Sequence, residues 1–183
     1  MAFASKFTGM LCLASYVAVL ALASNGGCIA ATTIEFESPE NFPPSIVSEP
    51  NAEFPLNRIG QINLDDPVET PEMPLEVIIR DPNFDQTLDY RIFLDAPDPP
   101  TAEIEIQDGE IEPSGFLERP RTFTISYNEL DPGECHRIEL VVVGAFASNV
   151  EKRRPVDEGD IDEATWWVEV VDADNPVINE QCR

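Results

Sequence analysis

Six short runs of β-branched and aromatic residues, separated by clusters of proline, constrain the fold of this chain more than any other feature. The chain has 17 prolines, 9 glycines and no long helical pattern in 183 residues, so the segments between the runs are predicted to be turns. Short strands at roughly regular spacing are typical of an all-β sandwich. The runs are Pro74–Arg80, Leu88–Asp95, Ala102–Gln107, Arg121–Tyr127, His136–Val143 and Thr165–Val171.

Alternating side chains predict which face of each strand is buried. Leu75, Val77 and Ile79 fall on one side of the first run, as expected of a half-buried strand. The run that ends at Val143 alternates less cleanly, which indicates a central strand covered on much of both faces. Of the two adjacent tryptophans near the end of the chain, one is expected in the core and the other at the rim of a sheet.

The turn into the fifth run has the sequence LDPGECHRIELVVV. It resembles the turn before the sixth strand of immunoglobulin-like and fibronectin type III domains, and Leu130, Pro132 and Gly133 match that pattern. His136 stands where those families place a tyrosine that ties the corner to the backbone, a hydrogen bond that an imidazole is also able to donate. The resemblance implies an immunoglobulin-like β-sandwich of about seven strands, which we assign to residues 44–183.

The N-terminus begins with a short hydrophobic segment. Met10–Ala23 is an almost uninterrupted apolar run, shorter than the ~20 residues of a membrane-spanning helix, and it ends in the small and turn-forming residues SNGG. A signal peptide fits better than an anchor. Cleavage after Ala23 would leave three cysteines, cleavage after Ala30 would remove Cys28, and cleavage before Cys28 would place that cysteine at the N-terminus.

The third cleavage site resembles the lipobox of bacterial lipoproteins, in which small residues precede a cysteine that is then acylated. Gly26 and Gly27 match the small positions, whereas Asn25 replaces the usual apolar residue. The resemblance implies a signal peptide over residues 1–27, lipidation of Cys28 and a polar, Pro-rich tether over residues 28–43. The protein is then exported to a bacterial cell envelope, as an outer-membrane lipoprotein or, without the lipid, as a periplasmic or secreted protein.

The mature chain is strongly acidic. Removing Lys6 with the leader leaves 10 Lys and Arg against 35 Asp and Glu, a net charge of −25. Such a surface repels nucleic acid and anionic lipid, so we exclude nucleic-acid partners and expect membrane contact only through the lipid anchor.

Cys135 and Cys182 are the two cysteines expected inside the domain, and export favours a disulfide between them. A bridge that encloses 46 intervening residues would stabilise the fold by ~4 kcal/mol in the chain-entropy treatment. The chain has no Cys-x-x-Cys pair, so the bridge is expected to be structural.

No motif for catalysis is present. His136 is the one histidine, and the chain has no Gly-x-Ser-x-Gly, phosphate loop or His-Glu-x-x-His. We therefore expect no enzyme activity and no cofactor. The weak candidates for a metal site are acidic residues able to offer oxygen ligands to calcium: Asp157, Asp160, Asp162, Asp172 and Asp174.

The one basic cluster, Glu151–Pro155, opens a long excursion between the last two runs. Such a loop is either a partner contact or a charged insertion without structure of its own. The sequence thus predicts a non-enzymatic envelope module that binds a protein or glycan through strand-connecting loops or an edge strand. Two alternatives remain: a calcium-dependent adhesion or stability module, and an accessory domain of a secreted hydrolase.

Overall fold

The described residues form eight strands and one short 3₁₀ helix. The computed structural model describes residues 41–66, 71–95, 104–175 and 182. The elements are β1 (Ser45–Ser48), β2 (Gly60–Asn63), β3 (Glu72–Arg80), β4 (Leu88–Leu94), β5 (Ile104–Ile111), β6 (Glu118–Ser126), η1 (Tyr127–Glu129), β7 (Cys135–Val143) and β8 (Ile161–Val171).

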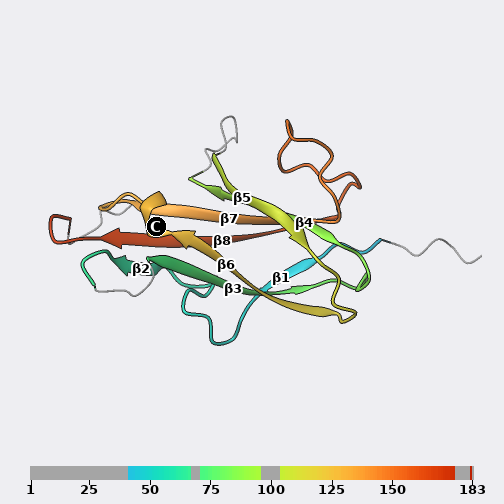
Figure 1. Ribbon diagram of the computed structural model, residues 1–183, viewed down its shortest axis with the longest axis horizontal. Helices are drawn as coiled ribbons and strands as arrows, with labels where there is room; N and C mark the ends of the chain where they lie inside the picture. Colours follow the sequence, from blue (N-terminus) through green and yellow to red (C-terminus); the bar gives the residue numbers. More distant parts are fainter. Residues whose placement is uncertain (1–40, 67–70, 96–103, 176–181, 183) are drawn as a thin grey trace, which may run out of the picture. The chain divides into compact units, whose positions relative to one another are not determined.

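The strands form two sheets, one of three strands in the order β1-β3-β6 and one of five in the order β2-β8-β7-β4-β5 (Figure 1). All neighbours in these sheets are antiparallel except β2, which runs parallel to β8. The connections β3–β4 and β5–β6 and the chain entering β1 lie at the right-hand end in Figure 1. This end is important for the site described below.

The two sheets share one core. The inward side chains of β3, which are Met73, Leu75, Val77 and Ile79, are all at most 1 % exposed. They belong to one cluster with inward residues of β4, β6, β7 and β8. The prediction of an all-β sandwich is confirmed at this level, because burial of one face of each sheet against the other is what defines that architecture.

All six predicted runs contain a strand, and the predicted faces are correct for β3. The predicted central strand is β7, in which Leu140 to Val143 are all fully buried. The tryptophan pair divides as expected. Trp166 is 2 % exposed and its Nε1 donates to the Phe54 carbonyl oxygen at 2.9 Å, whereas Trp167 is 40 % exposed.

The expected number of about seven strands is too low, because two strands of four residues were not predicted. Both β1 and β2 lie in a polar, Pro-rich part of the chain and have no clear alternation of their own. Each is held by a longer partner far away in sequence, with Ile46 opposite Ile79 and Ile62 opposite Val170. Pairing of this kind leaves little local signal.

The disulfide between Cys135 and Cys182 is present, with a Cα–Cα distance of 5.5 Å. The predicted signal peptide, Cys28 and the tether as far as residue 40 lie outside the described residues. The last residues assigned to the tether, 41–43, are hydrogen-bonded to the sandwich through Asn41 and Phe42.

Candidate functional site

His136 lies on the inward side of β7 and is 2 % exposed. Its Nδ1 is 2.7 Å from Oδ2 of Asp95, the residue that directly follows β4. Its Nε2 is 3.0 Å from the Asp131 carbonyl oxygen in the turn before β7. The second bond ties the start of β7 to the backbone of the turn before it. Both ring nitrogens are thus engaged, and the exposed imidazole that a hydrolytic triad needs is not found at His136.

The charge state of this pair follows from its acceptors. A carboxylate and a carbonyl oxygen both only accept, so both imidazole nitrogens donate in the protonated ring. The hydrogen bond to Asp95 raises the pKa of His136 more than burial lowers it. Burial acts to raise the pKa of Asp95, but hydrogen bonds from His136 and the Arg137 backbone outweigh it and hold that pKa below its usual value. The pair is an ionic staple between β4 and β7 in which the imidazole is buried and the Asp95 side chain is 41 % exposed.

The acidic residues considered for calcium separate into three places. Asp162 accepts from the Ile46 backbone N–H at 2.6 Å and so fastens β1 to β8. Asp172 accepts from the backbone of Asp174 and of Asn175, which closes the turn after β8. These carboxylates have structural partners, and the five candidates do not form one site.

Asp157 and Asp160 do lie together, near the chain entering β1. The Asn41 amide nitrogen is 2.9 Å from Asp160 Oδ2 and 3.5 Å from Asp157 Oδ2. Asn83 Nδ2 donates to Asn41 Oδ1 (2.7 Å) and to the Phe42 carbonyl oxygen (3.0 Å). Because a carbonyl oxygen only accepts, this network fixes the orientation of both amides.

One atom of this network has no partner. Asp160 is 6 % exposed, and its Oδ1 is buried without a hydrogen bond among the described groups. Gly144 makes room for the carboxylate, since a Cβ there would collide with Oδ2. Within the described ranges no group of three or more His, Cys, Asp or Glu side chains is arranged to hold a metal ion.

The excursion between β7 and β8, residues 144–160, folds back over the outer face of the five-stranded sheet. Phe146 and Pro155 form an isolated antiparallel bridge. Arg91 of β4 donates to the carbonyl oxygens of Lys152 (2.9 Å) and Ser148 (3.4 Å), and it lies 4.1 Å from the centre of the Phe146 ring. The loop is therefore anchored to the sheet at its base.

The basic cluster of this loop makes intramolecular contacts. Lys152 Nζ is 3.4 Å from Glu105 and Arg153 Nη2 is 2.9 Å from Glu139, while the Arg153 guanidinium stacks over Phe93 at 4.4 Å. Two of the three basic side chains in the cluster thus hold the loop on the sheet. A charged insertion without structure is not what forms here.

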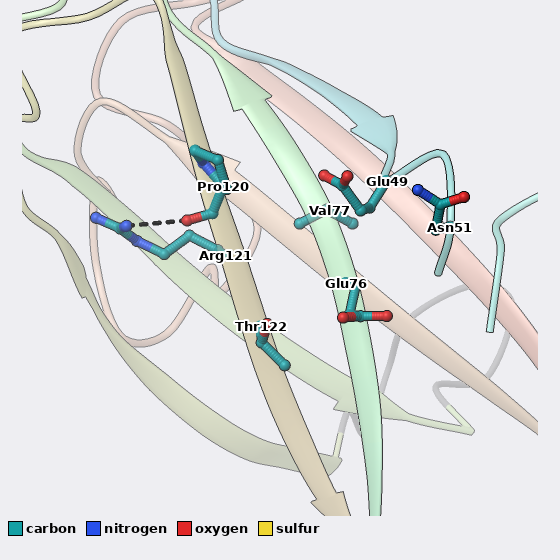
Figure 2. Close-up of a pocket in the computed structure, with 7 residues that line it drawn as sticks. All are labelled: Glu49, Asn51, Glu76, Val77, Pro120, Arg121 and Thr122. Atoms are coloured by element: carbon teal, nitrogen blue, oxygen red, sulfur yellow. Dashed lines mark hydrogen bonds between the residues drawn. The ribbon is translucent and has the colours of Figure 1, made fainter. Parts of the chain in front are cut away.

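A shallow groove of about 400 Å³ crosses the outer face of the three-stranded sheet (Figure 2). Glu49 and Glu76 lie on this face with Thr122 and Asn51, whereas Arg121 points away and bonds to the Pro120 carbonyl oxygen. Glu49 and Glu76 are in no ion pair among the described residues. No aromatic side chain is among the described residues that line the groove, and the carboxylates of Glu49 and Glu76 would attract a cation weakly.

A second feature is apolar. Four large side chains are exposed on the chain segments that Figure 1 draws at its right-hand end, and we call them the phenylalanine end: Phe42 (47 %), Phe84 (50 %), Phe116 (73 %) and Leu117 (51 %). They belong to the chain entering β1, the β3–β4 connection and the β5–β6 connection. Exposed aromatic residues on strand connections mark an interaction site more often than a core.

The sequence analysis did not identify the phenylalanine end, Asp95 or the buried pair of Asp81 and Arg119. A signal for the first was available, because Phe84 in NFDQ and the pair Phe116 and Leu117 in SGFLE are apolar residues among polar turn residues. Asp95 has the left-handed backbone conformation (φ 47°), which no sequence pattern indicated. Asp81 and Arg119 look like ordinary surface residues until the fold brings them together.

Comparison with known protein families found no match, and neither did comparison with curated proteins. In the described part of the chain, no helix has the length and hydropathy needed to cross a bilayer.

Proposed function

We propose that the protein is a non-enzymatic binding module of a bacterial cell envelope, built as an immunoglobulin-like β-sandwich and anchored by a lipid on Cys28. The observation that carries the binding role is the contrast between two groups of residues. The one histidine is buried and engaged as a staple, whereas large apolar side chains are exposed on the connections at one end. A binding surface needs exposed anchors, and a catalytic site needs accessible titratable groups.

The immunoglobulin-like assignment is supported by connectivity. In that fold the first, second, fourth and fifth strands share a sheet, and the third, sixth and seventh share the other. With β2 set aside, β1, β3 and β6 take the places of the first, second and fifth strands, and β4, β7 and β8 those of the third, sixth and seventh. The strand β5 differs from the fourth strand of that fold, because it pairs with β4 in the larger sheet. The corner turn agrees with it, since Leu130 is 3 % exposed and Gly133 has a φ of 82° that favours glycine.

Export is supported by the disulfide, because such bridges persist in oxidising compartments. If the chain is cut before Cys28, both remaining cysteines of the mature domain are paired and Cys28 is left for acylation. The segment between Cys28 and Asn41 then serves as the tether.

Intact mass of the envelope-extracted protein tests this proposal. The expected mass is that of the chain from Cys28 with acyl groups attached, and reduction should add the mass of two hydrogens for the bridge. A Cys28→Ser variant should lose the acyl mass and appear in the soluble envelope fraction. A mass that starts after Ala30, or one without acyl groups, would overturn the anchor while leaving the binding role to be judged separately.

A second candidate, calcium-dependent stabilisation, is favoured by the partnerless Oδ1 of Asp160 beside Asp157. A buried carboxylate without a positive partner is costly, and a bound cation would remove that cost. Calorimetry should then show a melting temperature about 2–4 °C higher in calcium than in EDTA. Asp160→Asn should remove the difference, with Asp172→Asn as the control, and equal melting temperatures in both buffers would exclude this candidate.

A further inference from the structure

Hydrogen bonds to backbone carbonyl oxygens connect the three segments of the phenylalanine end. Asn83 Nδ2 donates to the Phe42 carbonyl oxygen at 3.0 Å, the Gly115 N–H donates to the Phe84 carbonyl oxygen at 3.2 Å, and the Asp81 N–H donates to the Leu117 carbonyl oxygen at 2.9 Å. These bonds join all three chain segments that carry the exposed side chains. Their exposure is therefore a property of an ordered surface.

A buried ion pair joins the β3–β4 connection to the start of β6. Arg119 Nη2 is 2.8 Å from Asp81 Oδ2, and both side chains are fully buried. Arg119 also donates to the carbonyl oxygens of Gln86 (2.7 Å) and Asn83 (3.1 Å), so it fixes the β3–β4 connection that carries Phe84. A surface ordered before binding loses less conformational entropy when a partner docks.

The charges around these apolar side chains are negative. Asp85, next to Phe84, and Asp157, at Asn41, are exposed, and neither belongs to an ion pair within the described residues. The nearby basic side chains are engaged, since Arg80 pairs with Glu118 at 3.0 Å and Arg119 is buried. The phenylalanine end thus combines apolar anchors with a border of uncompensated carboxylates.

We infer that the phenylalanine end docks into an apolar groove bordered by Lys or Arg on a partner protein. This inference rests on the binding role proposed above and names the chemistry of the partner. Charge complementarity selects this occupant: a second copy of the chain, at a net charge of −24, and an anionic bilayer would both bring like charges together. The exposed phenylalanines then supply contact area at the centre, and the carboxylates set the orientation.

A peptide probe tests the inference without depending on acylation. The probe is a synthetic amphipathic helix with leucines on one face and lysines on both flanks, and the reference peptide has serines in place of the leucines. Amide chemical shifts of the ¹⁵N-labelled exported chain report the contact. The leucine peptide should shift residues 42, 83–85 and 115–118, whereas the serine peptide of equal charge should bind at least about tenfold more weakly.

Exposed-site variants supply the matched comparison. Phe84→Ser and Phe116→Ser should each weaken binding of the leucine peptide about tenfold, whereas Val150→Ser, at a residue that is 91 % exposed, should leave it unchanged. Urea unfolding of each variant checks that the fold is intact. Equal binding of the two peptides, or shifts spread over the whole acidic surface, would overturn the inference.

The other occupants have their own readouts. Flotation with phosphatidylcholine vesicles that depends on Phe116 would assign this surface to lipid instead. Sedimentation that shows self-association of the exported chain, abolished by Phe116→Ser, would assign it to a second copy. Either result contradicts a basic protein partner, whereas the acyl mass of the envelope-extracted protein bears only on the anchor.

Discussion

At the scale of single residues, the least exchangeable groups are the buried charged side chains and their ionic partners. His136 and Asp95 join β4 to β7, and Asp81 and Arg119 join the β3–β4 connection to β6. Each pair lies at one end of a strand, where the backbone leaves the sheet and needs partners. Burial raises the pKa of Asp81, although the Asn83 N–H and Arg119 act against it. The free-energy cost of burying the Asp81 carboxylate is offset only while the Arg119 guanidinium is present.

Replacing Asp95 should change how stability depends on pH. The raised pKa of His136 means that its contribution is complete below about pH 6.5 and is lost as the pH rises through the folded pKa. The lowered pKa of Asp95 means that its contribution is complete above about pH 3.9 and is lost as the pH falls further. Wild type should therefore exceed Asp95→Asn in unfolding free energy near pH 5.5 and lose much of this advantage by pH 9.

The expected difference is about 1 kcal/mol at pH 5.5, because the Asp95 side chain is 41 % exposed and solvent screens the pair. Urea unfolding at the two pH values measures it. Asp108→Asn, an exposed carboxylate on the neighbouring strand β5, is the control and should show no such pH dependence. A difference that is the same at both pH values would mean that His136 is not protonated in the fold.

Removing the Arg119 side chain should lower the free energy of unfolding far more than removing that of Arg80, which lies one position further along the β3–β6 register. Arg119→Met leaves Asp81 buried without its cation, and we expect a loss of about 3–5 kcal/mol. Arg80→Met breaks a pair whose two side chains are each about half exposed, and it should cost less than about 1 kcal/mol. Urea unfolding of both variants measures the two losses of unfolding free energy. Equal losses would contradict a structural role for the buried pair.

At the scale of elements, the 144–160 loop behaves as an extension of the sheet. Phe146 in its base and Ile161, the first residue of β8, pack with Phe93, Val141 and Val143 on the outer face. This cover explains why the last part of β7, Leu140 to Val143, is apolar on both faces although one of them is the outer face of the sheet. A strand with water on one face would need alternating polar residues there.

Arg91 should control how readily a protease cleaves the 144–160 loop. Arg91→Met keeps an apolar stem near Phe146 but loses the bonds to the Lys152 and Ser148 carbonyl oxygens and to Asn149 Oδ1. Trypsin cleavage within residues 152–154 should become about tenfold faster, because local opening then costs about 1.4 kcal/mol less.

The control for this experiment is Arg121→Met, which also removes arginine bonds to backbone carbonyls but far from the loop. Its cleavage rate at residues 152–154 should match that of wild type. Unchanged proteolysis of Arg91→Met would show that the loop is held by other contacts.

At the scale of the whole molecule, two sheets are closed by a few long-range connections. Trp166 reaches Phe54 in the β1–β2 segment, Asp162 fastens β1, and the disulfide ties Cys182 back to the start of β7. These contacts join the first segments and the last residue of the described chain to β7 and β8 of the five-stranded sheet. They stabilise the domain mainly by restricting the unfolded chain and by satisfying buried groups.

Loss of the disulfide should destabilise the domain without changing its sheets. Cys182→Ser is expected to lower the unfolding free energy by ~4 kcal/mol, measured by urea unfolding. Reductant should produce the same loss in wild type and no further loss in the variant. A wild-type protein insensitive to reductant would contradict a stabilising role for the bridge.

Much of the fold could be predicted because its signal is local. The two-residue period of Leu75, Val77 and Ile79 follows from strand geometry, and it holds wherever the strand is placed. The pairing of Cys135 with Cys182 followed from counting the cysteines that remain after the predicted leader. The faces of β4 were harder, because Arg91 and Phe93 lie under a loop whose Lys152 is 61 residues beyond Arg91 in the chain.

By itself, the sequence determined the all-β class, the six long strands and the disulfide pair, since alternation and cysteine number are properties of short stretches or of composition. Only the tertiary structure decided the pairing of β1 and β2, the partner of His136 at 41 positions' distance and the gathering of Phe42, Phe84 and Phe116 at one end. The physical reason is that these depend on which segments meet. That is settled by packing of two sheets over one core, and no single segment encodes it.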